Sequence, residues 1–228
     1  MRVSFIVPTY NEAATVREIL DRVLSLELDS QLVVADDGST DGSVELLDAW
    51  ARDYPDHVVL HLPHRGKGAA VRAAIPHVTG EITVIQDADL EYDPVDVPAV
   101  IEPITRGDAD VVYGSRLSGG RPQRAYLFWH LVGNRVLALL ANVLFNTTLH
   151  DIETGYKAFR TDVLRTLTLT RDDFGIEAEL TGEICRRKLR IYEIPVAYYG
   201  RTAAEGKKIG WQDGFRAIRV LLEVRLRR

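Results

Sequence analysis

Three carboxylates at alternate positions, Asp87, Asp89 and Glu91, form the group of side chains best suited to chemistry. They follow the apolar segment 82–86, which has the composition of a buried strand. Carboxylates this close together repel one another unless a cation lies between them, and oxygen ligands suit Mg²⁺ or Mn²⁺. We therefore expect these three residues to bind one of these ions. The alternative is that Asp87 and Asp89 only cap the turn before Pro94.

Polar and charged residues also follow four other apolar segments, at positions 8–12, 36–41, 64–68 and 114–116. The ligands of open α/β sheets bind beyond the carboxyl ends of the strands. Folding stability alone does not readily explain why polar and charged residues follow all five of these segments. The pattern indicates one binding site assembled from all five segments.

Asp36 and Asp37 stand where an acidic side chain can accept hydrogen bonds from a nucleoside base or a ribose. Ser39 or Thr40 is expected to cap the helix that follows. A helix cap formed by Ser39 or Asp41 is the alternative explanation of this polar segment, and the two roles are compatible.

Lys67 and Arg116 are the candidate phosphate-binding cations. Lys67 lies between Gly66 and Gly68, but the segment has neither the P-loop spacing nor the dinucleotide-binding fingerprint. A solvated lysine in a glycine turn explains it nearly as well. Arg116 directly follows a buried strand, where a guanidinium can meet a diphosphate with two hydrogen bonds.

The elements that must position these residues alternate along the chain. Strands are predicted at 3–7, 31–35, 57–62, 82–86, 110–113 and 190–196. Helices are predicted at 12–26, 44–50, 68–77, 96–105, 124–145, 177–187 and 211–228. Buried strands separated by such helices predict an α/β fold with a mostly parallel central sheet and helices on both faces. We expect residues 1–210 to form one domain, with 211–228 a basic amphipathic helix that belongs to it or contacts a membrane surface.

Charge and composition exclude several classes of protein. The 228 residues carry a formal net charge of −5, which argues against a general nucleic-acid-binding protein. The charge is uneven, because residues 185–228 are strongly basic and hint at an anionic partner. One cysteine, Cys185, excludes an internal disulfide. No uncharged apolar run of about 18 residues is present, so we expect no segment to span a bilayer unaided, and a cytoplasmic protein.

Segments 7–12, 35–41, 66–70, 87–92 and 114–116 (VPTYNE, ADDGSTD, GKGAA, DADLEY and GSR) resemble the family-2 glycosyltransferases, which have the GT-A fold. Segments 153–160 and 200–211 match as well. The sequence is most similar to the dolichol-phosphate mannosyltransferase group, which moves a sugar from a nucleotide diphosphate to a polyprenyl phosphate. The resemblance implies a metal-dependent transferase with a nucleotide-sugar donor, a polyprenyl phosphate acceptor, and Mg²⁺ or Mn²⁺ as cofactor.

The resemblance also implies roles for individual residues. The nucleotide sugar would be held by Pro8, Tyr10, Glu12, Asp36, Asp37, Lys67, Asp87, Ala88 and Arg116. The metal would be bound by Asp89 and Glu91, with Asp87 beside them. The transfer itself would depend on Asp89, Arg116, Arg201 and Lys207, the last two engaging phosphate groups. Related enzymes often carry glutamine or serine where this chain has Glu91, so the metal here would face more negative charge.

A lipid phosphate is already anionic and can attack the anomeric carbon without a general base, which inverts its configuration. A sugar hydroxyl as acceptor would require a base, for which Glu177 and Glu179 are candidates. GDP-mannose is the first expectation for the donor and UDP-glucose the second, both from the resemblance. A transferase acting on sugar hydroxyls in polysaccharide, glycolipid or natural-product synthesis, and a non-catalytic nucleotide-sugar-binding subunit of a membrane complex, are the alternatives.

A lipid acceptor would place the protein at the inner face of a membrane, alone or with a membrane-protein partner. Segments 131–145 and 211–228 could lie on an anionic membrane surface. Ordinary core packing with one solvated face is the alternative for both.

Overall fold

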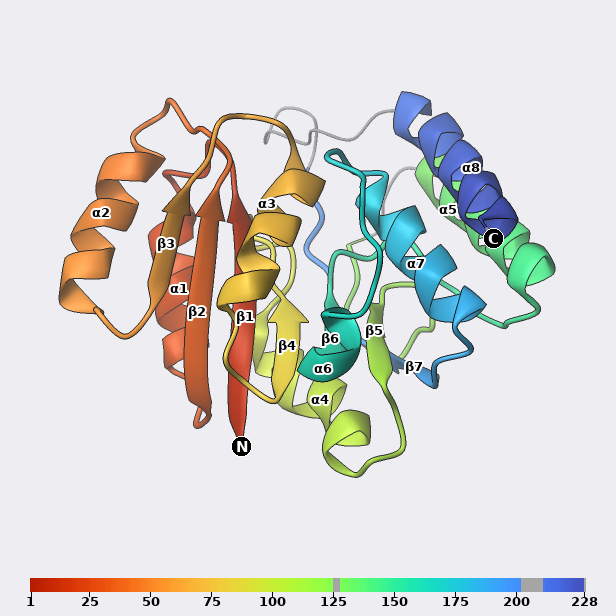
Figure 1. Ribbon diagram of the computed structural model, residues 1–228, viewed down its shortest axis with the longest axis horizontal. Coiled ribbons are helices and arrows are strands. Elements are labelled where there is room, and N and C mark those ends of the chain that lie inside the picture. The colour runs from red at the N-terminus through yellow and green to blue at the C-terminus, as the bar shows by residue number, and fades with distance from the viewer. Residues whose placement is uncertain (125–127, 202–210, 228) are drawn as a thin grey trace.

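A seven-stranded sheet forms the centre of the computed structural model, which describes residues 1–124, 128–201 and 211–227 (Figure 1). The strands lie in the order β3-β2-β1-β4-β6-β5-β7. Their bounds are β1 Arg2–Thr9, β2 Asp29–Asp36, β3 Val58–His61, β4 Ile82–Ile85, β5 Val111–Ser115, β6 Lys157–Arg160 and β7 Ile191–Pro195. All neighbouring strands are parallel except that β6 runs antiparallel to β4 and β5. The predicted mostly parallel sheet is confirmed.

Strand β6 is the one strand of the sheet that the sequence did not predict. It has four residues, two of them the cations Lys157 and Arg160, and so carries no apolar run to signal a strand. Lys157 nevertheless has no solvent exposure, because the strand lies between β4 and β5 in the middle of the sheet. Short strands with charged residues escape prediction from hydrophobic patterning.

Helices cover both faces of the sheet. They are α1 Val16–Leu24, α2 Ser43–Asp53, α3 Lys67–Ala74, α4 Val97–Thr105, α5 Phe128–Phe145, α6 Thr161–Leu164, α7 Ile176–Arg186 and α8 Trp211–Leu226, with short 3₁₀ turns η1 Ile75–His77 and η2 Pro94–Asp96. Alternate residues of β1 face the two layers. Phe5 packs with α1, α2 and α4, whereas Ile6 packs with α3 and the helices α5 to α8. Two cores therefore form, one on each face.

The predicted cap of the second helix is wrong. Helix α2 begins after Gly42, and no side chain of that residue can cap it. Ser39 Oγ instead accepts a hydrogen bond from the backbone N–H of Asn11 at 2.8 Å, and Asp41 Oδ1 accepts one from the N–H of Ser43 at 3.1 Å. Ser39 thus joins the loops after β1 and β2.

Helix α8 packs onto the domain. It lies against α5 and α7 and contributes Val220, Leu221 and Val224 to the core of that face (Figure 1). Gly182 of α7 permits the close approach, because a Cβ there would lie 2.8 Å from Val224 Cγ1. Arg227 Nη2 donates a hydrogen bond of 2.8 Å to the buried Glu179. The described part of segment 211–228 therefore belongs to the same folded unit.

Asp110 joins three strands at the end of the sheet opposite to the polar and charged segments that follow the strands. Its carboxylate accepts hydrogen bonds from Arg190 Nη2 at 2.7 Å and Nε at 3.1 Å, and from Arg160 Nη1 at 3.3 Å. The hydrogen bonds from Arg190 hold the pKa of Asp110 at about 2. These contacts tie the start of β5 to β6 and β7.

We predict that Asp110→Asn lowers the free energy of unfolding by about 1 kcal/mol at pH 7, because charge-assisted hydrogen bonds are lost at a partly exposed site. A carboxylate with a lowered folded-state pKa stabilises the fold above its unfolded pKa of about 3.9, and this stabilisation disappears as the pH falls towards the folded value. Thermal melts from pH 7 to pH 2 should show the difference between the proteins vanishing at the acid end. Asp108→Asn, which removes only an exposed ion pair with Arg106, is the control. An Asp110→Asn difference that persisted at pH 2 would contradict the assignment.

Candidate active site

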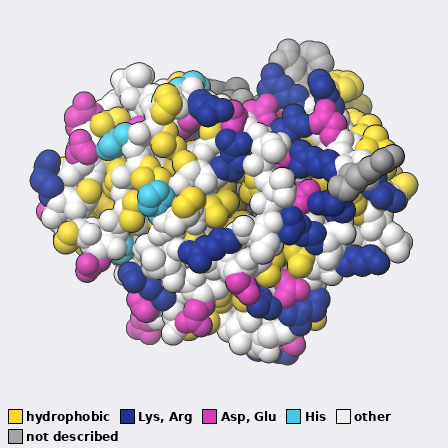
Figure 2. All heavy atoms as spheres, viewed as in Figure 1, with side chains coloured by type: hydrophobic (Ala, Val, Ile, Leu, Met, Phe, Trp, Pro, Cys, Tyr) yellow, Lys and Arg dark blue, Asp and Glu magenta, His cyan; other side chains and the backbone are white. Residues whose placement is uncertain are grey.

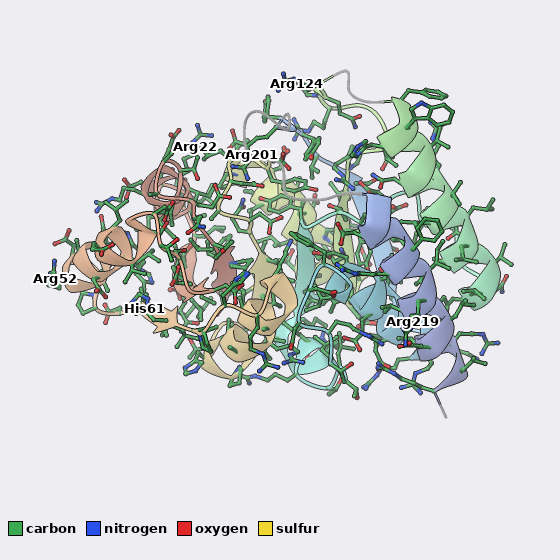
Figure 3. The ribbon with its side chains drawn as sticks, turned by 90° about the horizontal axis from the view of Figure 1, so that it is seen from above. Arg22, Arg52, His61, Arg124, Arg201 and Arg219 are labelled. Carbon is green, nitrogen blue, oxygen red and sulfur yellow. The ribbon has the colours of Figure 1, made fainter. Side chains whose placement is uncertain are left out.

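A cavity of about 690 Å³ opens at the carboxyl ends of the central strands. Figure 3 looks down on this edge and shows Arg201 over the central part of the molecule, with Arg52 and Arg219 towards opposite ends. Eleven of the predicted site residues line the cavity: Pro8, Tyr10, Glu12, Asp37, Lys67, Asp87, Ala88, Asp89, Glu91, Arg116 and Arg201. Asp36 is not among the lining residues, and Lys207 lies outside the described residues. The fold thus brings together the polar and charged residues that follow the strands, as expected.

Asp36 has a structural position. Its carboxylate is buried, and its oxygens lie 3.3 and 3.4 Å from the N–H of Ser39 at the turn after β2. It therefore does not reach the cavity, unlike its neighbour Asp37. The prediction that Asp36 contacts the nucleoside finds no support in this geometry.

Arg201 supplies positive charge to the acidic cluster, the group formed by Asp87, Asp89 and Glu91 in the loop after β4. Its Nη1 and Nη2 each lie 3.0 Å from an oxygen of Glu12, and Nη2 also lies 3.1 Å from Asp89 Oδ2. Its backbone N–H donates a hydrogen bond of 2.6 Å to Glu91 Oε1. Three acidic side chains, one from the loop after β1 and two from the loop after β4, therefore converge on one arginine.

The cluster holds more negative charge than Arg201 neutralises. Burial raises the pKa of Asp89 to about 7, the neighbouring Asp87 and Glu91 add to the increase, and Arg201 opposes it. The charge excess suits a divalent cation bound by carboxylate oxygens.

The three predicted metal ligands do not form a ready-made site, however. Among the described residues no three acidic, histidine or cysteine side chains are arranged to hold an ion. Asp87 Oδ1 is ion-paired with Lys67 Nζ at 2.7 Å, and Glu91 Oε2 accepts a hydrogen bond of 2.8 Å from the Tyr198 hydroxyl. Metal binding would require Asp89 and Glu91 to exchange their present partners.

Tyr10 and His64 form an aromatic wall of the cavity. Their rings are stacked, with centroids 4.1 Å apart and planes inclined by 15°. Asp37 fixes His64, since its Oδ2 lies 2.8 Å from His64 Nδ1 and also accepts a hydrogen bond from the N–H of Gly66. Asp37 thus shapes the wall through the 64–66 loop. No metal-ligand spacing in the sequence involves His64, and sequence reasoning did not select it.

Arg116 lines the cavity, but two N–H groups of its guanidinium already donate hydrogen bonds to another residue. Its Nε and Nη2 each donate a hydrogen bond of 2.7 Å to the two oxygens of Asp151, and its guanidinium lies 5.1 Å from the centre of the Tyr198 ring. Asp151 has no solvent exposure. A diphosphate could therefore meet Arg116 only through its remaining N–H groups. Asp151 was missed because it lies 35 residues from its partner.

Glu177 joins two lysines, the partly buried Lys67 and the fully buried Lys157. Its Oε1 lies 3.0 Å from Lys67 Nζ, and its Oε2 accepts a hydrogen bond from Lys157 Nζ. Burial would raise the pKa of Glu177, but Lys157 and Lys67 outweigh it and hold the pKa below its usual range. A carboxylate stabilised in this way is a poor general base. Glu179, the other predicted base, is buried away from the cavity lining and bound by Thr170 and Arg227.

Glu153 is a cavity residue that sequence reasoning did not select. Its Oε1 is inaccessible to solvent and has no hydrogen-bond partner among the described residues. Burial and then the negative charge of Glu177 raise the pKa of Glu153 to about 7, against the opposing charge of Lys157. The sequence holds no signal for this, because the state of Glu153 depends on groups distant in the chain.

Residues 4–168 match the family described as "Glycosyl transferase family 2". The chain therefore belongs to the family-2 glycosyltransferases. It is 35% identical over 200 residues to "Glycosyltransferase AglJ" of Haloferax volcanii, covering 87% of this chain and 63% of that protein. It is 30% identical over 223 residues to "Undecaprenyl-phosphate mannosyltransferase" of Micrococcus luteus, covering 92% and 88% of the two chains. The chain thus spans less than two thirds of the first of these relatives.

The fold has counterparts among solved structures. Glucosyl-3-phosphoglycerate synthase from Mycobacterium tuberculosis, crystallised with Mg²⁺ and uridine-diphosphate, superposes with a TM-score of 0.72 at 22% identity, covering 97% of this chain and 78% of that chain. The predicted GT-A fold and the resemblance to family-2 glycosyltransferases are confirmed.

We predict that Glu177→Gln lowers the free energy of unfolding by about 3 kcal/mol, because it leaves the fully buried Lys157 without its counter-charge. Urea denaturation at pH 7 measures the change. Glu45→Gln on the exposed face of α2 is the matched control and should shift stability by less than about 0.5 kcal/mol. Equal effects of the two substitutions would show that the Lys67–Glu177–Lys157 group does not stabilise the fold.

Proposed function

We propose that this protein is a metal-dependent inverting glycosyltransferase that moves a hexose from a nucleotide diphosphate sugar to a polyprenyl phosphate. The observation that carries the proposal is a cavity whose acidic cluster meets a helix with an exposed apolar side. His130, Leu131 and Asn134 of α5 line the cavity. On the same helix Trp129, Leu139 and Val143 are 78%, 62% and 73% exposed. A lipid could therefore bring its phosphate to the cavity along α5.

The residues fit a donor that binds as a metal complex. Asp89 and Glu91 would hold Mg²⁺ or Mn²⁺, which when bound neutralises charge on the departing diphosphate. Arg201 would then release Asp89 and turn its guanidinium to a phosphate group, the role also proposed for Lys207. Tyr10 and His64 would stack on the base, with Pro8, Glu12, Asp37 and Ala88 around the nucleoside. The relatives named above, one an undecaprenyl-phosphate mannosyltransferase, support this class of reaction. GDP-mannose is the donor we propose first, and UDP-glucose second.

The paired carboxylates favour an acceptor that needs no base. Glu177 is neutralised by two lysines, and Glu12, Asp89 and Glu91 share Arg201. A lipid phosphate is anionic at neutral pH and can attack the anomeric carbon from the face opposite the diphosphate. Inversion of the anomeric configuration follows from this geometry.

Transfer to a sugar hydroxyl is the second candidate function, and Glu153 favours it. A carboxyl in the cavity with a pKa near 7 has the property required of a general base at neutral pH. Acceptor choice separates the two candidates.

Purified protein incubated with labelled GDP-mannose or UDP-glucose and Mn²⁺ should transfer sugar to polyprenyl phosphate and not to soluble sugars. Asp89→Asn should lower turnover about a hundredfold or more, since metal stabilisation of the leaving group contributes several kcal/mol. Asp53→Asn, exposed at the end of α2, is the control. Transfer to soluble sugars alone would establish the second candidate. Donor binding without transfer to any acceptor would point to a non-catalytic subunit that needs a membrane partner.

The surface beside α5 supports attachment to a membrane. The sequence led us to expect no spanning segment, yet among the described helices α5 has 18 residues and is long and apolar enough, by length and composition only, to cross a bilayer. Only 17% of it is buried. Phe215 and Leu226 of α8 are 66% and 79% exposed beside it. Figure 2 shows Lys and Arg side chains gathered over the half of the molecule that carries α6 to α8.

We therefore propose that the protein lies on the cytoplasmic face of a membrane with α5 against the lipid. The double variant Leu139→Ser, Val143→Ser should reduce sedimentation with anionic liposomes by roughly tenfold or more, because two exposed apolar side chains no longer enter the lipid. High salt should weaken the binding of both proteins. Leu46→Ser removes a 40% exposed leucine from α2 and serves as the control. Sedimentation unaffected by the double variant would rule out α5 as the contact.

A further inference from the structure

We propose that the Glu153 carboxyl binds a hydroxyl group of the transferred hexose and thereby helps to select which sugar the enzyme accepts. The inference rests on the proposed function and adds to it a residue that contacts the sugar of the donor and discriminates between hexoses.

The order of the strands places Glu153 at the sugar end of the cavity. Tyr10 follows β1 and Asp37 follows β2, so the proposed nucleoside site lies over these two strands. The acidic cluster follows β4, the next strand across the sheet, and Glu153 precedes β6, the strand after that. A nucleotide sugar has its base, diphosphate and hexose in this same order. If the diphosphate lies at Asp89, the hexose lies on the side of the cavity where Glu153 is located.

The backbone at Gly155 brings this segment close to the acidic cluster. A Cβ at that position would lie 2.1 Å from Asp87 Oδ2 and 2.9 Å from Lys67 Nζ. Any side chain there would push the segment away from the cluster. Glycine therefore allows Glu153 to approach the place where the diphosphate would end and the sugar begin.

Glu153 differs from every other acidic side chain lining the described part of the cavity. The others have cations, hydroxyl groups or backbone N–H groups as partners, as described above for Glu12, Asp37, Asp87, Glu91 and Glu177. Glu153 Oε1 is buried with no partner among the described residues. Native structures seldom leave a buried polar atom unsatisfied, and those that remain often have a functional reason. A ligand group that donates a hydrogen bond would satisfy it.

The surrounding charges select a neutral donor group. A phosphate would be repelled by Glu153 and Glu177 together, and a metal ion would meet Lys67 and Lys157 beside Glu177. A hydroxyl carries no charge and can both donate and accept. A buried carboxyl whose pKa lies near 7 can likewise do both. Sugar hydroxyls are thus the ligand groups that match Glu153.

Titration calorimetry with Mn²⁺ tests the inference by separating the sugar from the nucleotide. The probes are GDP-mannose and UDP-glucose, the diphosphates GDP and UDP, and donor analogues that each lack one hexose hydroxyl. Glu153→Ala should weaken binding of the preferred nucleotide sugar by about 10- to 100-fold, the range for a lost hydrogen bond to a polar site, and that of the diphosphate by less than about twofold. One deoxy analogue should bind poorly to the wild type and lose no further affinity in the variant.

Glu153→Gln keeps the shape of the side chain and guards against a folding defect. Its melting temperature should not fall, because Glu153 Oε1 has no hydrogen-bond partner to lose among the described residues. Glu102→Gln, exposed on α4, is the matched control. Equal loss of diphosphate and nucleotide-sugar affinity would overturn the inference, and so would unchanged donor affinity with lost turnover, which is the behaviour of a general base. If the wild type binds donor and transfers sugar while Glu153→Ala behaves normally, the inference alone fails. If the wild type binds no nucleotide sugar, the proposed function fails with it.

Discussion

The need to neutralise buried carboxylates at one edge of the sheet shapes the rest of this structure. An isolated charge removed from water is very costly, so each buried carboxylate requires a cation or several hydrogen-bond donors. Arg201 meets this need for Glu12 and Asp89, Arg116 for Asp151, and the two lysines 67 and 157 for Glu177. Most of these partners come from opposite halves of the chain. Charge pairing therefore fastens the segments after β5 onto the half of the chain that carries β1 to β4 and lines the cavity.

The same pairing sets the state of the site before substrate arrives. Arg201 occupies the oxygens that a metal ion would need, and Arg116 presents an already filled fork. Under the proposed function, binding of the donor and its metal would exchange one set of ionic partners for another rather than fill an open set of ligands. Such an exchange conserves charge within the cavity, which keeps its cost low in a poorly solvated place. In the proposed reaction, affinity for the donor would then depend on its phosphates and the metal together.

The proposed access of a lipid would depend on how the core on the α5–α8 face of the sheet is covered. Helix α5 contributes Leu137, Ala138 and Ala141 to that core and leaves a separate apolar side exposed. Its first turns reach the cavity, so one helix connects the apolar surface with the acidic cluster. Helix α8 packs beside it and is held by Arg227 through the buried Glu179. The ion pair between Arg227 and Glu179 thus helps to hold α8 beside the exposed apolar side of α5.

Local sequence determined the alternation of strands and helices, the mostly parallel sheet, and the five polar strand ends, because hydrophobic periodicity and chain order fix these without long-range contacts. Its motifs identified eleven of the residues that line the cavity. Only the tertiary structure decided the rest. It turned Asp36 away, stacked His64 on Tyr10, inserted β6 antiparallel into the sheet, and paired Glu12 with an arginine 189 residues distant. The lack of a hydrogen-bond partner for Glu153 Oε1 in the described part of the chain and the neutralised state of Glu177 belong to this second group. Both depend on which charges lie nearby in space, and spacing along the chain carries no record of that.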